Sequence, residues 1–377
     1  MIDFKLSDEH LELQQRARKF ATEVVAPAAA HHDRTGEFPF KIAKIAHAEG
    51  LLNSLVEKKF GGPERGSLAT CIIAEEISAA CSGIGIALDA NALAQGPVLI
   101  AGNDDQKRRF LQPMIEKPTF ASYAVTEPDA GSDVSRLSTT ATRIDDKTYS
   151  INGLKWWITG GAVASWYFVL AKAEGGATGF IVPADTPGII RGVKEENLGQ
   201  HASNTVRVAF EDVRVPIENR LLNEGDGFKI AMKTFDYSRP LVAAAAVGVA
   251  RSALEHATKY AKRRKTFGKK IIKYQGVSFK LADMAMHVET ARLLTWKSAW
   301  LYDQGLPNTK ESAMAKAYAA DYCMQATIDA VQIMGGYGYS MEVPMEKLMR
   351  DAKIFQIYEG TSEIQRTIIV SSLMRGR

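Results

Sequence analysis

The chain has 377 residues, of which 46% are hydrophobic and 24% are charged, and its formal net charge is +4. This length and apolar content predict two or three domains with sizeable cores. The mild basic excess falls short of a nucleic-acid-binding signature, although it suits an anionic ligand or an acidic partner protein.

Targeting and redox signals are weak. The cysteines are few, odd in number and dispersed along the chain, which indicates reduced thiols. No apolar run reaches the length of a membrane span, and the N-terminus lacks a signal-peptide core. Its early acids Asp3, Asp8 and Glu9 are unlike an Arg-rich, acid-poor transit peptide. We therefore expect a bacterial cytoplasmic protein, or a mitochondrial matrix protein whose transit peptide has been removed.

Residues 1–118 are predicted to form an all-helical domain. Ser7 can cap a first helix over 7–26, which Pro27 ends. Apolar periodicity predicts further helices over 40–49, 67–80, 86–101 and 104–114.

The pattern changes after Pro118. Short β-rich runs over 166–171, 179–182 and 205–210 predict a β-domain of sandwich or barrel type over 119–226. Helical periodicity returns over 227–377, in long segments that resemble an antiparallel four-helix bundle. Their predicted ranges are 239–265, 275–304, 308–334 and 344–358. The fold class is therefore α+β, in three domains.

The stretch from Lys353 to Arg366 has a lone carboxylate, Glu359, at a joint between two helical segments. Thr361 can cap the second of these helices. An acid beside an apolar wall loses solvation of its charged form, which raises its pKa and makes it a stronger proton acceptor. From these residues alone, a general base and a helix-capping glutamate on a surface loop are equally consistent.

Two segments of the β-domain have the composition of a cofactor-binding surface. The segment from Tyr123 to Asp133 ends in a turn rich in hydroxyl and glycine residues, which offers N–H groups to a polar cofactor edge. An ordinary surface turn has the same composition. Trp157 and Thr159 follow, and a tryptophan of the core is the simpler alternative for Trp157.

Three further features bear on ligands. Pro240 predicts a helix start near Phe235, where an anion or phosphate is favoured, although a cap beside a surface arginine is the alternative. The basic run over 259–270 is typical of a solvated helix end rather than of a nucleic-acid site. The histidines are scattered and predict no metal site.

Ile357 to Arg366 resembles the catalytic segment of the acyl-CoA dehydrogenases, and the resemblance extends from about Asp3 to Leu373. It is closest to the medium-chain members. The resemblance implies the fold of that family and FAD-dependent α,β-dehydrogenation of an acyl-CoA thioester to the trans-2-enoyl-CoA. Glu359 would remove the α-proton while the β-hydride leaves to flavin N5. An electron-transfer flavoprotein would be the electron acceptor.

The resemblance also implies the cofactor and substrate residues. Some of the FAD residues would come from a neighbouring subunit, which implies a homotetramer built as a dimer of dimers. The FAD residues would be Tyr123, Val125, Thr126, Ser132, Trp157, Thr159, Arg264, Phe267, Gln275, Gln332, Gly335, Gly336, Thr361 and Glu363. The acyl-CoA residues would be Ser132, Asp236, Arg239, Tyr358, Glu359 and Gly360. Isovaleryl-type relatives carry their base near position 238, where Ser238 cannot serve.

Asp89 lies on an otherwise apolar helix that the resemblance places at the end of the acyl pocket. It is either a paired or hydrated acid at the pocket floor, or a second acid/base acting on a compact or cyclic acyl group. The acyl group itself is expected to be of medium size and straight, branched or alicyclic. An oxygen-using oxidase or monooxygenase on the same fold is a further alternative, whereas a non-catalytic relative would lack the acid at position 359.

Overall fold

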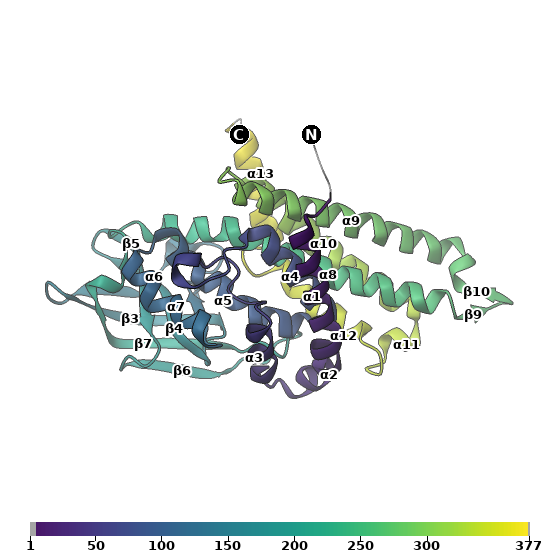
Figure 1. The fold of residues 1–377 in the computed structure, drawn as a ribbon, viewed down its shortest axis with the longest axis horizontal. Coiled ribbons are helices and arrows are strands. Elements are labelled where there is room, and N and C mark those ends of the chain that lie inside the picture. Colours follow the sequence, from purple (N-terminus) through teal and green to yellow (C-terminus); the bar gives the residue numbers. More distant parts are fainter. Residues whose placement is uncertain (1–4, 376–377) are drawn as a thin grey trace.

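The computed structural model describes residues 5–375, and its N-terminal part is helical, as expected (Figure 1). Successive turns of these helices bury apolar residues in a shared core that includes Leu13, Phe20 and Ile77. The helices are α1 (Asp8–Phe20), α2 (Ala26–Thr35), α3 (Phe40–Ala48), α4 (Gly66–Ala80), α5 (Ser82–Ala101), α6 (Asp104–Phe110) and α7 (Gln112–Glu116).

Two helix boundaries differ from the prediction. Pro27 does not end the first helical segment, because a π-helical turn over Ala21–Val25 leads into α2 and places Pro27 in the first turn of α2. In the π-helical turn the N–H of Ala26 bonds to the carbonyl of Ala21, five residues earlier, and this wider turn accommodates a proline that has no N–H to donate. Pro113 likewise lies in the first turn of α7, so the helix predicted over 104–114 is divided in two.

Helix α5 is long and apolar enough to cross a membrane, which the sequence prediction overlooked. Of its most apolar window, 61% is buried inside the protein. Its residues pack against both the N-terminal core and the β-domain, through Leu88 and Val98 respectively. The core helix of a globular protein passes the same test of length and composition, so this helix is weak evidence for a membrane span.

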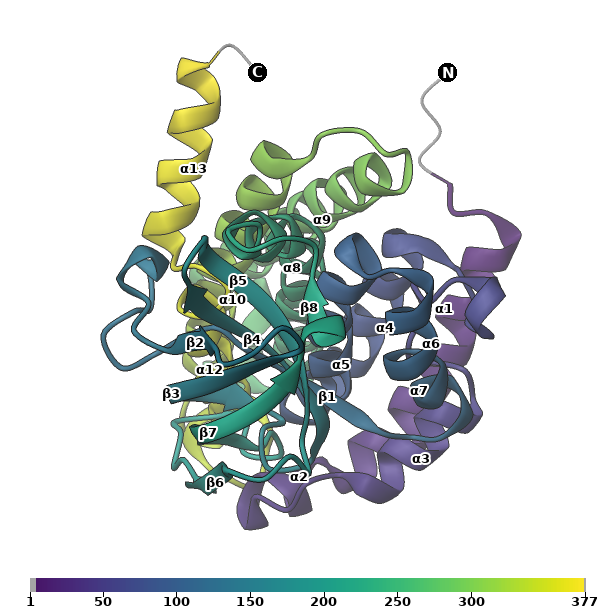
Figure 2. The same ribbon diagram turned by 90° about the vertical axis from the view of Figure 1, so that its left-hand side faces the viewer.

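The middle part forms one eight-stranded sheet with the order β6-β7-β3-β2-β4-β5-β8, and β1 pairs with β4 in parallel (Figure 2). Along β4, Trp166 and Phe168 face a core shared with α5, α6 and α8, whereas Tyr167 and Val169 face the core between the strands. This alternation is the pattern of a sheet buried on both faces. The strands are β1 (Phe120–Ala124), β2 (Thr140–Arg143), β3 (Thr148–Thr159), β4 (Ala164–Ala173), β5 (Gly176–Pro183), β6 (Ile189–Lys194), β7 (Thr205–Pro216) and β8 (Arg220–Leu221).

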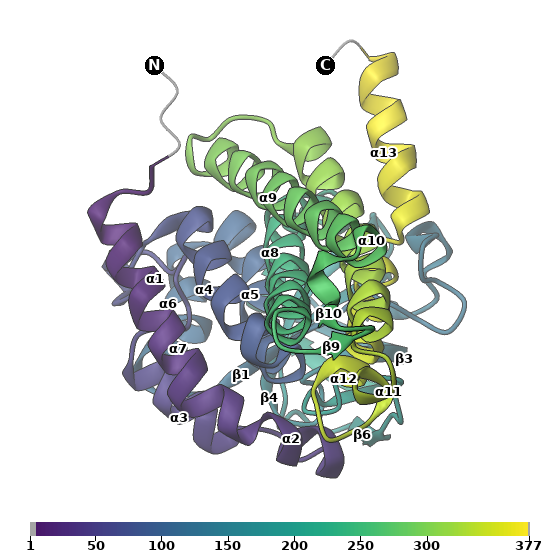
Figure 3. The same ribbon diagram turned by 90° about the vertical axis from the view of Figure 1, so that its right-hand side faces the viewer.

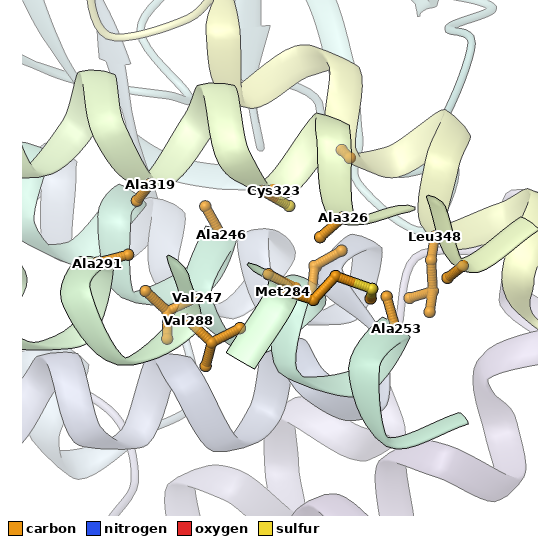
Figure 4. Close-up of a cluster of buried hydrophobic side chains, with 14 of the residues drawn as sticks. Ala246, Val247, Ala253, Met284, Val288, Ala291, Ala319, Cys323, Ala326 and Leu348 are labelled. Carbon is orange, nitrogen blue, oxygen red and sulfur yellow. The ribbon is translucent and has the colours of Figure 1, made fainter. Parts of the chain in front are cut away.

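Long helices return in the C-terminal part, where α8, α9 and α10 pack around a core of small side chains (Figure 4). Labelled members of this core include Ala246 on α8, Val288 on α9 and Cys323 on α10. The hairpin of β9 and β10 projects from the end of the bundle (Figure 1), and α13 stands away from the body of the bundle (Figure 3). The elements are α8 (Gly227–Ala261), β9 (Lys265–Thr266), β10 (Lys269–Lys270), α9 (Gln275–Asp303), α10 (Thr309–Met334), α11 (Gly336–Tyr339), α12 (Met345–Ala352) and α13 (Ser362–Met374).

The prediction of a helix start near Phe235 is wrong, because α8 begins at Gly227 and runs without a break past Pro240. Pro240 has no N–H to donate to the carbonyl of Asp236 four residues earlier. The side-chain amide of Asn308 donates to that carbonyl instead, at 2.9 Å. Asp236 and Arg239 therefore lie inside α8 and not at its N-terminus, so the N–H groups of this helix start are not beside them to bind an anion.

The helix predicted over 344–358 is also shorter than expected. Helix α12 ends at Ala352, and a 3-10 turn over Lys353–Gln356 follows. Helical segments, a sheet and a helical bundle succeed one another as predicted, whereas the boundaries at 118 and 226 stay predictions.

Candidate active site

Glu359 lies in the short connection between the 3-10 turn and α13, as the broken periodicity predicted. Its φ angle is 53°, a left-handed conformation that is uncommon for any residue other than glycine, and Gly360 follows at 91°. Helix α13 begins directly afterwards, where the Thr361 side chain accepts a hydrogen bond from the Ile364 N–H. The connection is therefore a tight turn that presents one carboxylate.

Side chains from two helices hold the backbone of this turn. Lys316 of α10 donates from Nζ to the carbonyl of Gly360 at 2.6 Å. Gln365 of α13 donates from Nε2 to the same carbonyl at 2.9 Å and to the carbonyl of Glu359 at 3.1 Å. Both side chains are fully buried. The strained conformation persists because these surroundings determine it.

The Glu359 carboxylate points toward α8, where Ser238 donates its hydroxyl to Oε2 at 2.5 Å. Burial raises the pKa of Glu359, while the hydrogen bond from Ser238 and the charges of Lys316 and Arg239 act in the opposite direction. A carboxylate with a raised pKa next to fixed polar partners matches the requirements of a general base.

Asp236 and Arg239 form an ion pair on the same helix, with Nη1 and Oδ1 3.1 Å apart. Thr309 also donates to Asp236, at 2.7 Å, although burial outweighs both partners and raises the pKa of this carboxyl. The buried Nε of Arg239 has no hydrogen-bond partner among residues 5–375. An unpaired buried donor is costly, so a ligand acceptor at this atom would stabilise the site.

Asp89 lies close enough to Glu359 for the two charges to interact. Burial, with a contribution from the negative charge of Glu359, raises the pKa of Asp89 to about 7. Asp89 also lines a small cavity, of about 20 Å³, together with Leu88 and Tyr237. The structure thus brings two carboxyl groups with raised pKa values into one region.

The β-domain residues predicted to bind the cofactor gather at the end of β1 and along β3. Tyr123 stacks on Phe168 with ring centroids 5.1 Å apart. Trp157 has φ at 62° and an indole that is 53% exposed, so it is not a core residue. The side chain of Val125, by contrast, is buried in the protein core. Thr126 and Thr159 are half-buried, and Ser132 is exposed in its turn.

A buried ion pair lies beneath this segment. Lys155 donates to Glu127 at 2.8 Å and to the carbonyl of Val125 at 3.0 Å. Glu127 also accepts from the N–H groups of Ser138 and Thr139, and these partners lower its pKa to about 2 despite burial. The pair fixes the backbone just before the turn that holds Ser132.

Thr361 and Glu363 lie at the start of α13, next to the Glu359 turn. The other predicted FAD residues lie at the far end of the bundle, away from the β-domain within one chain (Figure 1). Arg264, Gly335 and Gly336 line a hollow of about 540 Å³. Phe267 is 97% exposed on the β9–β10 hairpin. Gln275, at the start of α9, and Gln332, in the last turn of α10, are also exposed.

These surfaces fit a flavin dinucleotide. A Cβ added at Gly335 or Gly336 would meet no atom within 4 Å, so the backbone is open to close approach by a ligand. The exposed indole of Trp157 offers a face for a flat ring system. Within residues 5–375, no group of three or more His, Cys, Asp or Glu side chains is arranged to hold a metal ion.

Comparison with known proteins identifies the class. Three family models match in chain order: the N-terminal, middle and C-terminal domains of acyl-CoA dehydrogenase, over residues 7–118, 122–213 and 225–374. The chain belongs to the acyl-CoA dehydrogenase family. It is therefore an oxidoreductase that uses FAD.

Relatives and solved structures agree over the whole length. A probable medium-chain specific mitochondrial acyl-CoA dehydrogenase of Caenorhabditis briggsae is 45% identical, over 100% of this chain and 92% of the relative. Butyryl-CoA dehydrogenase from Megasphaera elsdenii is 41% identical with a TM-score of 0.96, over 99% of this chain and 100% of that chain. A structure described as the electron transferring flavoprotein of Acidaminococcus fermentans contains a chain that is 39% identical, with a TM-score of 0.97 and the same coverage.

Sequence reasoning missed two residues that hold the Glu359 turn. Lys316 is a lysine in an alanine-rich stretch of α10, at a position that packs inward with Ala313 and Ala320. A charged residue at a position that the helical periodicity assigns to the core was the signal that could have identified Lys316. Gln365 gave no such signal, because a polar residue in the first turn of a helix is common.

Gly360→Ala tests the turn. A Cβ at Gly360 would lie 2.6 Å from Nε2 of Gln365, and the residue would keep a left-handed φ. We expect kcat for acyl-CoA oxidation to fall about 100-fold, because the carboxylate moves from its position. Dye-reduction assays measure this.

Gly305→Ala is the matched control, because Gly305 has φ at 66° but no atom within 4 Å of an added Cβ. It should cost about 1 kcal/mol of stability and leave kcat unchanged. Equal losses of activity in the two variants would contradict a specific role for the turn.

Proposed function

We propose that this enzyme converts an acyl-CoA to its trans-2-enoyl-CoA, with Glu359 as the general base that removes the α-proton. The proposal rests on one observation: a buried carboxylate, held in a left-handed turn, has a raised pKa and a fixed hydrogen-bond partner in Ser238. A base of this kind accepts a carbon-bound proton more readily than an exposed carboxylate does. Medium-size straight, branched or alicyclic acyl groups are the proposed substrates.

The backbone of the turn supports polarisation of the thioester. The carbonyls of Glu359 and Gly360 accept from Lys316 and Gln365, whereas the N–H of Glu359 has no backbone acceptor within the described residues 5–375. A free, fixed N–H beside the base would donate to the thioester carbonyl and lower the pKa of the α-proton. Tyr358, Gly360, Asp236, Arg239 and Ser132 are proposed to bind the acyl-CoA around this point.

The cofactor is proposed to bind between the β-domain surface around Trp157 and the far end of the bundle of a second chain. Bound FAD supplies the acceptor for the hydride that leaves the β-carbon. Residues of one chain would contact its ring and ribityl region, namely Tyr123, Val125, Thr126, Ser132, Trp157, Thr159, Thr361 and Glu363. Because the side chain of Val125 is buried, its contact would come from the backbone.

Glu359→Gln tests the base. The amide keeps the shape of the side chain but accepts no proton, so flavin reduction by acyl-CoA should slow by about 10³-fold or more, while acyl-CoA binding is retained. Anaerobic stopped-flow spectroscopy measures both. Glu116→Gln, on exposed α7, serves as the control and should behave as wild type. Flavin reduction at the native rate in Glu359→Gln would refute the mechanism.

Asp89 favours a second candidate function, the dehydrogenation of a cyclic acyl-CoA with a second acid/base. A pKa of about 7 allows Asp89 to take up or release a proton near neutral pH. A compact ring could place a proton of the γ-carbon beside this carboxyl while the α-carbon faces Glu359.

A panel of straight, branched and alicyclic acyl-CoA esters tests this role. Asp89→Asn should lower kcat for alicyclic esters by about 10²-fold or more, with much smaller losses on straight chains. The straight chains act as the internal control for folding. Full activity of Asp89→Ala on every ester would remove the hypothesis and leave Asp89 as a pocket wall.

We further propose a homotetramer in which subunits share each FAD site. The support is the separation between the two groups of predicted FAD residues, because Arg264, Phe267, Gln275, Gln332, Gly335 and Gly336 surround the end of the bundle remote from the β-domain (Figure 1). Residues at opposite ends of one chain contact one dinucleotide only if a second chain supplies one of the groups.

Complementation between subunits tests the shared site. Trp157→Ala and Arg264→Ala should each weaken FAD retention when expressed alone. Co-expression should restore part of the FAD content, because a hybrid pair of chains forms one site with both native residues. Light scattering reports the oligomer. A monomer that retains FAD, or co-expressed chains without recovery, would contradict the proposal.

An electron-transfer flavoprotein is the proposed electron acceptor, supported by the chain of similar fold in the Acidaminococcus structure. Slow reoxidation of the acyl-CoA-reduced enzyme in air, and fast reoxidation by that flavoprotein, would support this acceptor; rapid reoxidation in air would favour an oxidase. Relatives include bacterial and mitochondrial enzymes, so the cytoplasm and the mitochondrial matrix are the proposed locations.

A further inference from the structure

Lys316 is a buried lysine without an ion-pair partner. Its side chain is inaccessible to solvent, and within the described part of the chain no carboxylate lies within 4.0 Å of Nζ. Two other buried lysines, Lys155 and Lys347, each contact a carboxylate directly. Burying an ammonium group away from water is costly unless something compensates. Burial accordingly lowers the pKa of Lys316 to about 8.

The nearest compensation comes from the turn that carries Glu359. Nζ donates to the Gly360 carbonyl at 2.6 Å, and the negative charge of Glu359 is the largest influence that favours the protonated lysine. Asp321 also acts on Lys316, but its carboxylate is already bound to Arg366 and Gln356. The lysine charge is therefore balanced chiefly through the carboxylate of the proposed base.

We propose that Lys316 is a positioning residue for Glu359, which fixes the left-handed turn through the Gly360 carbonyl and stabilises the ionised carboxylate before proton abstraction. This inference rests on the proposed function, since it assumes that Glu359 is the base. It assigns to α10 a role in the reaction, although Lys316 itself is proposed to touch neither substrate nor cofactor.

Lys316 would act in two ways, through its hydrogen bond to the Gly360 carbonyl and through its positive charge, and experiments can separate these two effects. The hydrogen bond alone fixes the geometry of the turn and affects kcat at every pH, whereas the charge also moves the pH at which Glu359 ionises. Titratable or hydrogen-bonding groups on the other elements packed against the turn also interact with Glu359. These groups stay unchanged when Lys316 is substituted. They are Ser238 and Arg239 of α8, Asp89 of α5, Tyr123 of β1 and Gln365 of α13.

Lys316→Met removes the donor and the charge at nearly constant volume. The ionised form of Glu359 loses a neighbouring positive charge, so its pKa rises and activity appears only at higher pH. We expect the acid limb of kcat/KM against pH to move up by about one unit, and kcat to fall about 10-fold or more at the optimum. Lys316→Arg keeps the charge and should restore the acid limb toward wild type.

Lys310→Met, in the first turn of the same helix, is the matched control and should keep the wild-type pH profile. If Lys316→Met does not accumulate in folded form, Lys316→Gln retains a donor and removes only the charge, and its acid limb must still move up. An unshifted acid limb in the folded variant, whatever the loss of kcat, would overturn the proposal. If Glu359→Gln were also fully active, the proposed function itself would fail; if Glu359→Gln is inactive, only the role of Lys316 is lost.

Discussion

The left-handed turn at Glu359 is the constraint on which the arrangement of this site depends. A non-glycine residue in this conformation persists only when its surroundings compensate for the strain. Here α8 binds the carboxylate through Ser238, α10 binds the next carbonyl through Lys316, and α13 binds both carbonyls through Gln365. Three helices thus determine one turn. Their contacts give the carboxylate a defined direction, while burial raises its pKa against the opposing effects of Ser238 and Lys316.

The turn is also tied to the other two domains. Asp351 on α12 accepts from the N–H of Gln200 in the β-domain at 2.5 Å and from the hydroxyl of Ser82 at the start of α5 at 3.2 Å. Gln200 in turn donates to the hydroxyl of Tyr358 at 3.4 Å, immediately before Glu359. Residues of all three domains therefore converge beneath the proposed base. Relative movement of the domains would therefore disturb the turn.

Buried charges cluster where the domains meet. Glu75 and Glu76 of α4 bind Arg18, Arg251 and Arg292 from α1, α8 and α9, and these contacts hold the pKa of Glu76 below its ordinary value. Glu76 pairs with Arg18 and Arg251, and Glu75 pairs with Arg251 and Arg292, so each buried carboxylate has two compensating charges. The network therefore specifies one arrangement of the N-terminal helices on the bundle. Lys316 differs from it, because its charge is balanced through the active-site turn.

The sequence by itself determined the helical and β-rich segments, the joint at Glu359 and the motifs of the family, because these depend on local periodicity and on residue types close together in the chain. It misplaced the helix start at Pro240, since the carbonyl that proline leaves unbonded is satisfied by Asn308, a residue distant in sequence. It also could not place Asp89 beside Glu359, or Lys316 under Gly360. Those relations arise only when helices distant in the sequence pack together and exclude water, which is what shifts the pKa values and holds the turn.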